Sequence, residues 1–242
     1  MVHFVCSGEC SGVSETPMAC GMKDCSKYNH PLIKCDCADN SHKRVFQVSI
    51  HKKNSVLIIT AGLPGTGKTT VSKKIAQALN FVHIDQNDVR RKLGMKKMPQ
   101  TQDKTLREID KLVSDYLRSG KNVIVDSVHR YMFRRQQLYG VASGNSAGVL
   151  VVECVCSPEE AKRRMRARPK NDGLLSDPNN PKVYDKLEQL WEDIIEYDFK
   201  YPGCDHVSYI TYNTENGAVE GRLIQRGMKQ FISQVKEILA SN

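Results

Sequence analysis

The spacing of apolar residues predicts alternating strands and helices over most of the chain. From Val45 onward, short apolar runs alternate with longer segments in which apolar residues recur every three or four positions. The runs that we expect to be strands are residues 55–60, 81–84, 122–126, 148–155 and 206–212. Uniformly apolar strands that alternate with helices are typical of an α/β domain. We therefore expect a mostly parallel, five-stranded sheet covered by helices on both faces.

Four segments have the apolar stripe of an amphipathic helix. The stripes are Val71, Ile75 and Leu79; Leu106, Ile109, Val113, Tyr116 and Leu117; Val183, Leu187, Leu190, Ile194 and Ile195; and Ile224, Met228, Phe231, Val235 and Ile238. We expect these side chains, together with Trp191, to pack in the core.

Residues 1–44 lack any such period and form a separate, cysteine-rich region. Six of the nine cysteines of the chain lie in its first 37 residues. So short a segment cannot bury a core of its own, and clustered cysteines in a reducing compartment favour a bound metal over disulfides. The spacing fits a structural Zn²⁺ site better than an iron–sulfur cluster and resembles small zinc ribbons. The candidate ligands are Cys6, Cys10, Cys20, Cys25, Cys35 and Cys37, with His30 and His42 in reserve.

Length and charge add a domain boundary and a class of partner. The 242 residues suit one α/β domain, which we assign to residues 45–242, after a small module at residues 1–44. The formal net charge of +9 favours anionic partners such as nucleotides, phosphorylated metabolites or nucleic acid. No run of about 18 apolar residues occurs, so we expect no membrane span. The start of the chain does not resemble a signal peptide, and we expect a cytoplasmic protein.

A glycine-rich segment follows the first predicted strand and opens a helix, as a phosphate-binding P-loop does. Glycines allow the backbone N–H groups to wrap closely around phosphate, and the helix N-terminus favours an anion. Lys68 is expected to reach the β- and γ-phosphates of ATP, and the Thr69 hydroxyl to ligate Mg²⁺. The predicted nucleotide-binding residues are Gly62, Gly65, Thr66, Gly67, Lys68, Thr69 and Thr70.

The segment that follows the second predicted strand resembles the P-loop kinases of the polynucleotide kinase, zeta-toxin and adenylylsulfate kinase group. The resemblance implies an Asp-x-x-Arg element, whose aspartate accepts the proton of the attacking hydroxyl and whose arginine holds the acceptor. Asp88 and Arg91 have this spacing. A second register uses Arg90, places Asn87 at the base position and leaves Asp85 as the nearest carboxylate. We favour Asp88 as the base, keep Asp85 as its rival, and note that Asp88 would also suit a helix N-cap.

The third predicted strand ends in Asp126, where the resemblance implies a carboxylate that holds Mg²⁺. His129 follows in a loop and either contacts the acceptor or is solvated. The resemblance also implies that Arg134 and Arg135 face the acceptor; a solvated helix face is the alternative.

A dense run of cationic residues between 162 and 168 precedes a segment rich in Pro, Gly and Asn. The resemblance implies a mobile lid over about residues 164–181. It also implies that one lid arginine stabilises the transferred phosphoryl group while another flanks the adenine. The resemblance implies an Arg-x-x-x-Arg pair in this helix, which Arg164 and Arg168 form, and the spacing does not identify which of them does which. Lys162 and Arg166 share another face, and one of the two faces is expected to be solvated.

These features predict an ATP-dependent kinase that transfers the γ-phosphate to a hydroxyl of a nucleic-acid end, a nucleoside or a small metabolite. One alternative is an ATP-hydrolysing switch or binding protein whose cysteine-rich module contacts a protein or nucleic acid. Another is a metal-dependent nucleic-acid adaptor with a regulatory P-loop. The sequence leaves the acceptor and the oligomeric state open.

Overall fold

The chain divides into two compact units, Met1–Lys53 and Asn54–Asn242. The expected boundary at residue 44 lies outside the described residues, so its position stays a prediction. The computed structural model describes residues 2–6, 10, 12–25, 27–37, 55–94, 99–168, 179–199 and 207–241.

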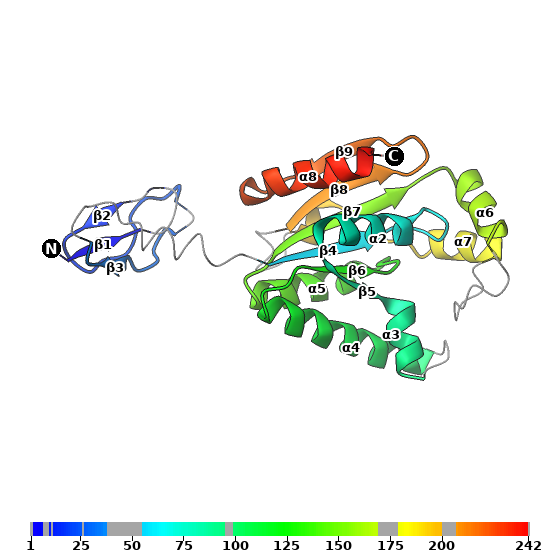
Figure 1. The fold of residues 1–242 in the computed structure, drawn as a ribbon, viewed down its shortest axis with the longest axis horizontal. Coiled ribbons are helices and arrows are strands. Elements are labelled where there is room, and N and C mark those ends of the chain that lie inside the picture. The colour runs from blue at the N-terminus through cyan, green and yellow to red at the C-terminus, as the bar shows by residue number, and fades with distance from the viewer. Residues whose placement is uncertain are drawn as a thin grey trace. The chain divides into compact units, whose positions relative to one another are not determined.

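The first unit contains a small antiparallel sheet in the order β2-β1-β3 (Figure 1). Its strands are β1 (His3–Val5), β2 (Val13–Ser14) and β3 (Ile33–Cys35). Strands of two or three residues are too short to show a period in the sequence, so they were not predicted. Among the described residues, the buried apolar side chains of this unit are Val5 and four cysteines. Units with so small an apolar core usually depend on a metal or a disulfide for stability.

The second unit is built on a six-stranded sheet in the order β5-β6-β4-β7-β8-β9. All five predicted strands are present and pair in parallel. The sixth, β9, pairs antiparallel with β8 at the edge of the sheet and was not predicted, because its residues are mostly exposed. The strands are β4 (Val56–Ala61), β5 (Val82–Asp85), β6 (Val123–Asp126), β7 (Gly148–Val155), β8 (Val207–Asn213) and β9 (Val219–Leu223).

Helices cover both faces of this sheet and form a three-layer fold (Figure 1). On one face, Ile58 packs with residues of α2 (Lys68–Leu79) and α8 (Lys229–Ala240). On the other face, Leu57 and Ile59 pack with α4 (Pro99–Arg118) and α5 (Met132–Gly144). Successive residues of β4 therefore serve opposite layers, as the pleat of a strand requires. None of the helices in the described part of the chain is long and apolar enough to cross a membrane.

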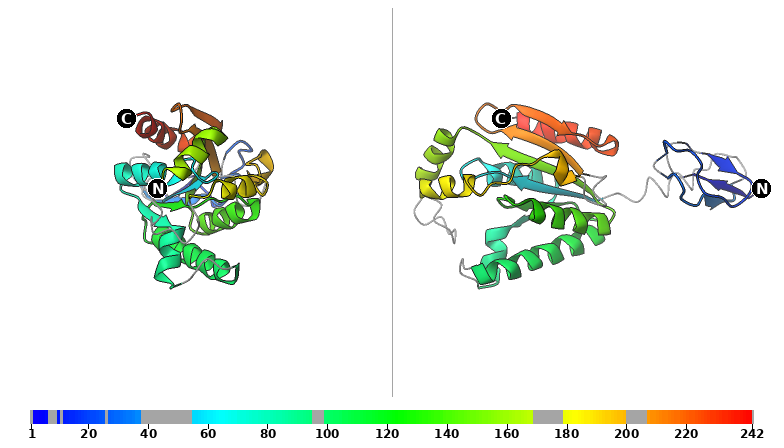
Figure 2. Two further views of the ribbon diagram at one scale, coloured as in Figure 1. Left: turned by 90° about the vertical axis from the view of Figure 1, so that its right-hand side faces the viewer. Right: turned by 180° about the vertical axis from the view of Figure 1, so that it is seen from behind.

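Three further helices lie where the strands end. Helix α3 (Gln86–Lys92) follows β5 directly. Helices α6 (Pro158–Arg166) and α7 (Pro181–Glu188) pack on each other at one end of the sheet in the views of Figures 1 and 2. Most of the predicted lid, residues 169–178, lies outside the described residues.

Two predicted helical stripes are longer than the helices that form. Helix α7 ends at Glu188, so Leu190, Ile194 and Ile195 lie beyond it, before a short 3₁₀ turn, η1 (Glu196–Phe199). The last stripe loses Ile224, because η2 (Arg226–Met228), which contains Gly227, precedes α8. The apolar spacing thus continued past the true helix ends.

A buried ion pair ties the start of α5 to η1. Both side chains of the pair, Arg135 and Asp198, are completely buried, and the Arg135 Nε lies 2.6 Å from the Asp198 Oδ2. The same guanidinium donates to the carbonyls of His129, Arg130 and Asp193 at 3.0, 3.1 and 3.2 Å. The expectation that Arg135 faces the acceptor is therefore wrong: its donors are spent on holding the chain after α7 against α5.

Removal of this guanidinium should destabilise the second unit strongly. In Arg135→Ala the Asp198 carboxylate stays buried without its cation, which costs about 3–5 kcal/mol of the free energy of unfolding. The measurement is urea unfolding. Arg118→Ala is the control, because the Arg118 side chain is 72% exposed beside Asp115, and its change should stay within about 0.5 kcal/mol. Similar unfolding midpoints for the two variants would contradict this account.

Candidate active site

The loop between β4 and α2 approaches neighbouring backbone too closely for any residue but glycine. Gly62 and Gly65 have φ values of 137° and 84°, in the left-handed region. A Cβ atom at Gly65 would lie 2.3 Å from the carbonyl oxygen of Ala161 in α6. At Gly62 it would lie 2.4 Å from the carbonyl oxygen of Cys154 at the end of β7. The loop thus wraps tightly between β4, β7 and α6.

The predicted nucleotide-binding side chains gather at the N-terminus of α2. Lys68 is the first residue of the helix and its Nζ donates to the carbonyl of Leu63 at 2.7 Å. Burial lowers the pKa of Lys68. Thr69 and Thr70 lie exposed in the same turn, while the buried Thr66 hydroxyl donates to the Leu63 carbonyl at 2.8 Å. One ammonium group and two accessible hydroxyls therefore stand at the positive end of a helix dipole.

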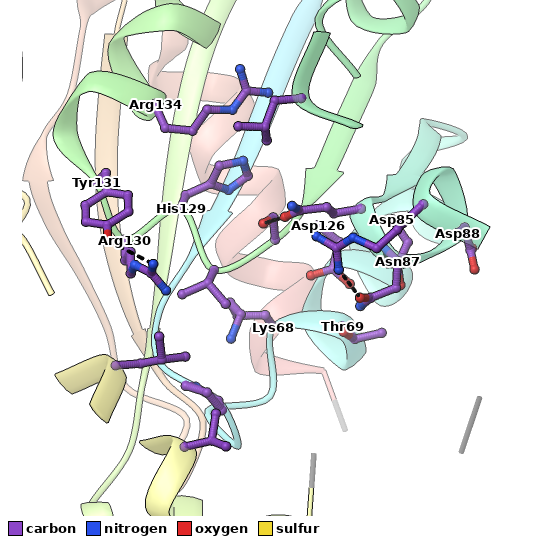
Figure 3. A pocket seen from close by; sticks show the side chains of 18 of the residues that line it. Lys68, Thr69, Asp85, Asn87, Asp88, Asp126, His129, Arg130, Tyr131 and Arg134 are labelled. Carbon is purple, nitrogen blue, oxygen red and sulfur yellow. Dashed lines mark hydrogen bonds between the residues drawn. The ribbon is translucent and has the colours of Figure 1, made fainter. Parts of the chain in front are cut away.

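Two carboxylates lie side by side at the ends of neighbouring strands. Asp85 and Asp126 are register partners at the carboxyl ends of β5 and β6 (Figure 3). Asp126 is buried. Its Oδ1 accepts a bond from the Thr60 hydroxyl at 3.4 Å, whereas its Oδ2 has no hydrogen-bond partner among the described residues. The Oδ2 atom lies 3.9 Å from the Nε2 of His83.

Asp85 caps helix α3 and shares the environment of Asp126. Its Oδ1 accepts a hydrogen bond from the backbone N–H of Asn87 at 2.6 Å. Burial, followed by the nearby Asp126 carboxylate, raises the pKa of Asp85 above its ordinary value of 3.8. Asp85 also lines the larger of the two cavities described below.

Asp88, which the sequence favoured as the base, has a different environment. Its side chain is 51% exposed and pairs with Arg91 on the same helix, and Figure 3 shows it apart from Asp85 and Asp126. Arg90 instead is buried, and its Nη1 lies 3.4 Å from the Oδ1 of Asn87. The geometry therefore favours the register with Arg90 and Asp85. The N-cap role considered for Asp88 belongs to Asp85.

The side chains of His129 and Arg134 are both buried. The alternative considered from the sequence, that each is a solvated surface residue, is therefore wrong. His129 is buried with a positive φ of 46°, and its Nδ1–H donates to the Thr60 carbonyl at 2.6 Å. Burial lowers the pKa of His129 to about 3, so the ring is neutral at physiological pH. Arg134 is buried too, and its Nη1 bonds both oxygens of Asp110, at 2.7 and 2.9 Å. Asp110 was not recognised from the sequence, where it is an ordinary polar position of α4.

Arg164 connects the helix before the lid to the P-loop. Its Nε donates to the Glu160 carboxylate at 2.6 Å, and its Nη1 to the hydroxyl of Thr214 at 2.7 Å. The Thr214 hydroxyl in turn donates to the carbonyl of Thr66 at 3.0 Å. Thr214 lies in the turn between β8 and β9. It was missed because β9 was not predicted, although the run from Asn213 to Gly217 has the composition of a turn.

These residues line two cavities that share the P-loop. The larger, of about 1270 Å³, contains Lys68, Asp85, Asp126 and Arg134 in its wall (Figure 3). The smaller, of about 410 Å³, is lined by Thr70, Tyr212, Thr214 and Arg164, among others. Arg168 lines both cavities.

Four cysteines of the first unit converge. The sulfur atoms of Cys6, Cys10, Cys20 and Cys25 all lie within 4.8 Å of one another. The Sγ atoms of Cys6 and Cys25 are 3.6 Å apart, and those of Cys10 and Cys20 are 3.5 Å apart. Four thiolates around Zn²⁺ have sulfur–sulfur separations of about 3.8 Å, given Zn–S bonds of about 2.3 Å. This cluster therefore has the size of a tetrahedral metal site.

Backbone hydrogen bonds favour the thiolate form of one member of this cluster. The N–H groups of Cys10 and Lys27 lower the pKa of Cys25 to about 6. The other two candidate ligands, Cys35 and Cys37, pack against Val5 and lie outside the set of four sulfurs. Of the two histidines held in reserve, His30 is exposed and His42 lies outside the described residues.

Comparison with known families now identifies the second unit. The model of a family described as "AAA domain" matches residues 57–185, more than half of the 242 residues. The chain belongs to this AAA domain family. The matched range contains the P-loop, both carboxylates, helix α6 and the first part of α7.

One curated protein that is similar to part of the chain has a kinase name. A Thermococcus gammatolerans protein named "Putative adenylate kinase" is 37% identical over 73 residues, which are 29% of this chain. The match spans about 40% of the length of that relative.

Solved structures share the fold at low identity. A "putative kinase" from Chloroflexus aurantiacus has a TM-score of 0.52 and 18% identity, over 75% of this chain and 98% of its own. Chaetomium thermophilum Kti12, solved in complex with ADP-AlF3, has a TM-score of 0.51 and 16% identity, over 76% and 100%. The AAA domain therefore has the P-loop kinase fold.

A side-chain methyl group at the position of Gly65 should disrupt the phosphate-binding conformation of the P-loop. Gly65→Ala forces a Cβ into the Ala161 carbonyl at a strained φ, and we expect at least about tenfold weaker ATP binding. Equilibrium titration with a fluorescent ATP analogue measures it. Gly140→Ala is the matched control, because a Cβ there has no heavy atom within 4 Å. Equal affinity of the two variants would contradict the close approach.

Proposed function

We propose that the AAA domain is a kinase that transfers the γ-phosphate of ATP to a hydroxyl group. The observation that carries this proposal is the pair Asp85 and Asp126, adjacent at the ends of β5 and β6 in the same cavity as Lys68. A P-loop alone serves switches and motors as well. A second carboxylate with a raised pKa beside the P-loop is what an attacking hydroxyl needs.

The donor binds across the P-loop in this proposal. The loop N–H groups and Lys68 hold the phosphates, while the smaller cavity, beside Arg164 and Tyr212, receives the adenine. Arg164 suits the adenine side, because its guanidinium is already bonded to Thr214 in that wall. Arg168 lines both cavities and is the better candidate to stabilise charge on the transferred phosphoryl group.

The residues of the site fit a magnesium ion. Thr69 offers an exposed hydroxyl, and Asp126 offers an Oδ2 atom that is buried without a hydrogen-bond partner among the described residues. Oxygen donors of this kind are what Mg²⁺ requires, directly or through water. When bound, the ion supplies positive charge to the β- and γ-phosphate oxygens.

The acceptor hydroxyl is activated by Asp85 rather than Asp88. The oxygen of the acceptor hydroxyl forms a bond to the γ-phosphorus. The bond between the γ-phosphorus and the β–γ bridging oxygen breaks, and ADP leaves. The hydroxyl proton passes to the Asp85 carboxylate, which lines the same cavity as Lys68. Arg90 and Arg134 line the same cavity and orient the acceptor. Arg91, bonded to Asp88, has a lesser part.

In the first unit, Cys6, Cys10, Cys20 and Cys25 bind one structural Zn²⁺ in this proposal. The size of the sulfur cluster and the scarcity of other buried apolar side chains support it. Thiolates kept for a metal suit a reducing compartment such as the cytoplasm.

Substitution of each aspartate in turn should show which of the two is the general base. Asp85→Asn removes the proton acceptor and should lower kcat by about 10²- to 10⁴-fold, whereas Asp88→Asn should stay near the wild type. The measurement is transfer from γ-labelled ATP to a panel of 5′-hydroxyl nucleic acids, nucleosides, adenylylsulfate and amino sugars. Because the pKa of Asp85 is raised, activity should fall as the pH drops through a value above 3.8, and the Asn variant should lose this acid limb.

Lys68→Ala is the control for nucleotide dependence and should abolish transfer. Hydrolysis of ATP without transfer to any acceptor would reject the kinase and support a switch. Loss of activity in Asp88→Asn with retention in Asp85→Asn would return the base to Asp88.

Purified full-length protein should contain about one zinc per chain, since four thiolates complete one tetrahedral site. Cys20→Ser should lose the metal and destabilise the first unit, whereas Cys35→Ser should retain it. Metal content by mass spectrometry after chelator-free purification tests this. Zinc loss in Cys35→Ser with retention in Cys20→Ser would show that a different set of cysteines binds.

A further inference from the structure

Two stacked aromatic rings line the larger cavity near the start of α5. Tyr131 and Phe133 have ring centroids 5.6 Å apart with an interplanar angle of 24°. The Arg130 guanidinium lies 4.4 Å from the centroid of the Tyr131 ring (Figure 3). Phe133 is nevertheless 55% exposed. A supported ring that keeps much of its surface in water is a ready surface for a flat ligand.

Apolar side chains also line this cavity. Leu187 and Leu190, from α7 and the turn after it, line the same cavity, and Leu190 is 41% exposed. A small sugar can lay only a C–H face on an aromatic ring, and the hydroxyls at its edge still require hydrogen-bond partners. A nucleobase instead has two π-faces that gain from such contact. The platform therefore suits a base better than a sugar ring.

The charge of the residues that line the larger cavity and the volume of this cavity both suit a nucleotide-like acceptor. Nine Lys or Arg residues and five Asp residues line the cavity, so cations predominate. A volume of about 1270 Å³ exceeds the ~300–1,000 Å³ of ordinary small-molecule sites, which leaves room for a nucleoside beside the donor phosphates.

From these observations we infer that the acceptor carries a nucleobase, which stacks on Phe133 while its sugar hydroxyl faces Asp85. This inference rests on the proposed kinase function. The base belongs either to a free nucleoside or to the terminal residue of a single-stranded nucleic acid. Tyr131 and Arg130 are positioning residues, because they support the ring that contacts the base.

The test is a double-mutant cycle in which the Phe133 side chain and the nucleobase of the ligand are each removed. The measured quantity is the binding affinity of the ligand. Full-length Asp85→Asn protein, with a non-hydrolysable ATP analogue, is titrated with 5′-hydroxyl fluorescent tetranucleotides whose first residue is adenosine or abasic. Loss of one stacked base weakens binding by about 5- to 150-fold. We expect this loss for Phe133→Ala with the adenosine probe and no loss with the abasic probe. Equal losses for the two probes, or none for either, would overturn the inference.

Two controls separate stacking from folding. Phe133→Trp keeps a π-face and should bind the adenosine probe as the parent does. Ile195→Ala removes an apolar side chain of similar exposure, 53%, that does not line the cavity, and should change nothing. Failure of Phe133→Trp to bind, with an unchanged melting temperature, would count against stacking.

Other arms identify the source of the base and keep the two proposals distinguishable. Adenosine that binds as tightly as the tetranucleotide indicates a nucleoside, and tighter, salt-sensitive binding of the tetranucleotide indicates a nucleic-acid end. Coupling in the cycle without transfer by the wild type would reject the kinase and retain the base site. Efficient transfer to base-free sugars that is insensitive to Phe133→Ala would reject the base site and retain the kinase.

Discussion

The parallel register of β4, β5 and β6 is the constraint on which the site depends. It sets Asp85 beside Asp126 and brings both to the edge where β4 turns into the P-loop. Side chains alternate along a strand, so a slip of one residue would turn Asp126 toward the opposite layer and bury a carboxylate among apolar side chains. The apolar residues that fill both layers therefore also fix the chemistry at the strand ends.

The sequence predicted this framework well because its signals are local. The P-loop glycines, the five parallel strands and the positions of Lys68 and Asp126 follow from short motifs and uniform apolar runs. The different environments of Asp85 and Asp88 do not follow from local signals, because they depend on where α3 begins, and Asp85 itself sets that point by capping the helix. The end of α7 at Glu188 was not predicted for a related reason. An apolar pattern does not show where a helix stops and the side chains pack from an irregular segment instead.

Long-range polar contacts were equally hidden from the sequence. Arg134 and Arg135 are adjacent and look alike in the sequence, yet one bonds Asp110 at the cavity and the other bonds Asp198 in the core. The cysteines show the same limit, since six candidates in one segment offer many sets of four, and the fold of the first unit gathers Cys6, Cys10, Cys20 and Cys25. The described cores of the two units thus differ in content: apolar layers in the AAA domain, and mainly cysteines in the smaller unit.

The edge hairpin of β8 and β9 has a role that its exposure conceals. Its turn carries Thr214, whose hydroxyl joins Arg164 to the P-loop carbonyl of Thr66. Edge hairpins usually tolerate insertions, because they lie outside the main core. Here a longer turn would move that hydroxyl and release the arginine, so the length of this hairpin is restricted even where its residues are free to vary. The length of an exposed turn is thereby constrained by the hydrogen bonds that its threonine makes to the P-loop.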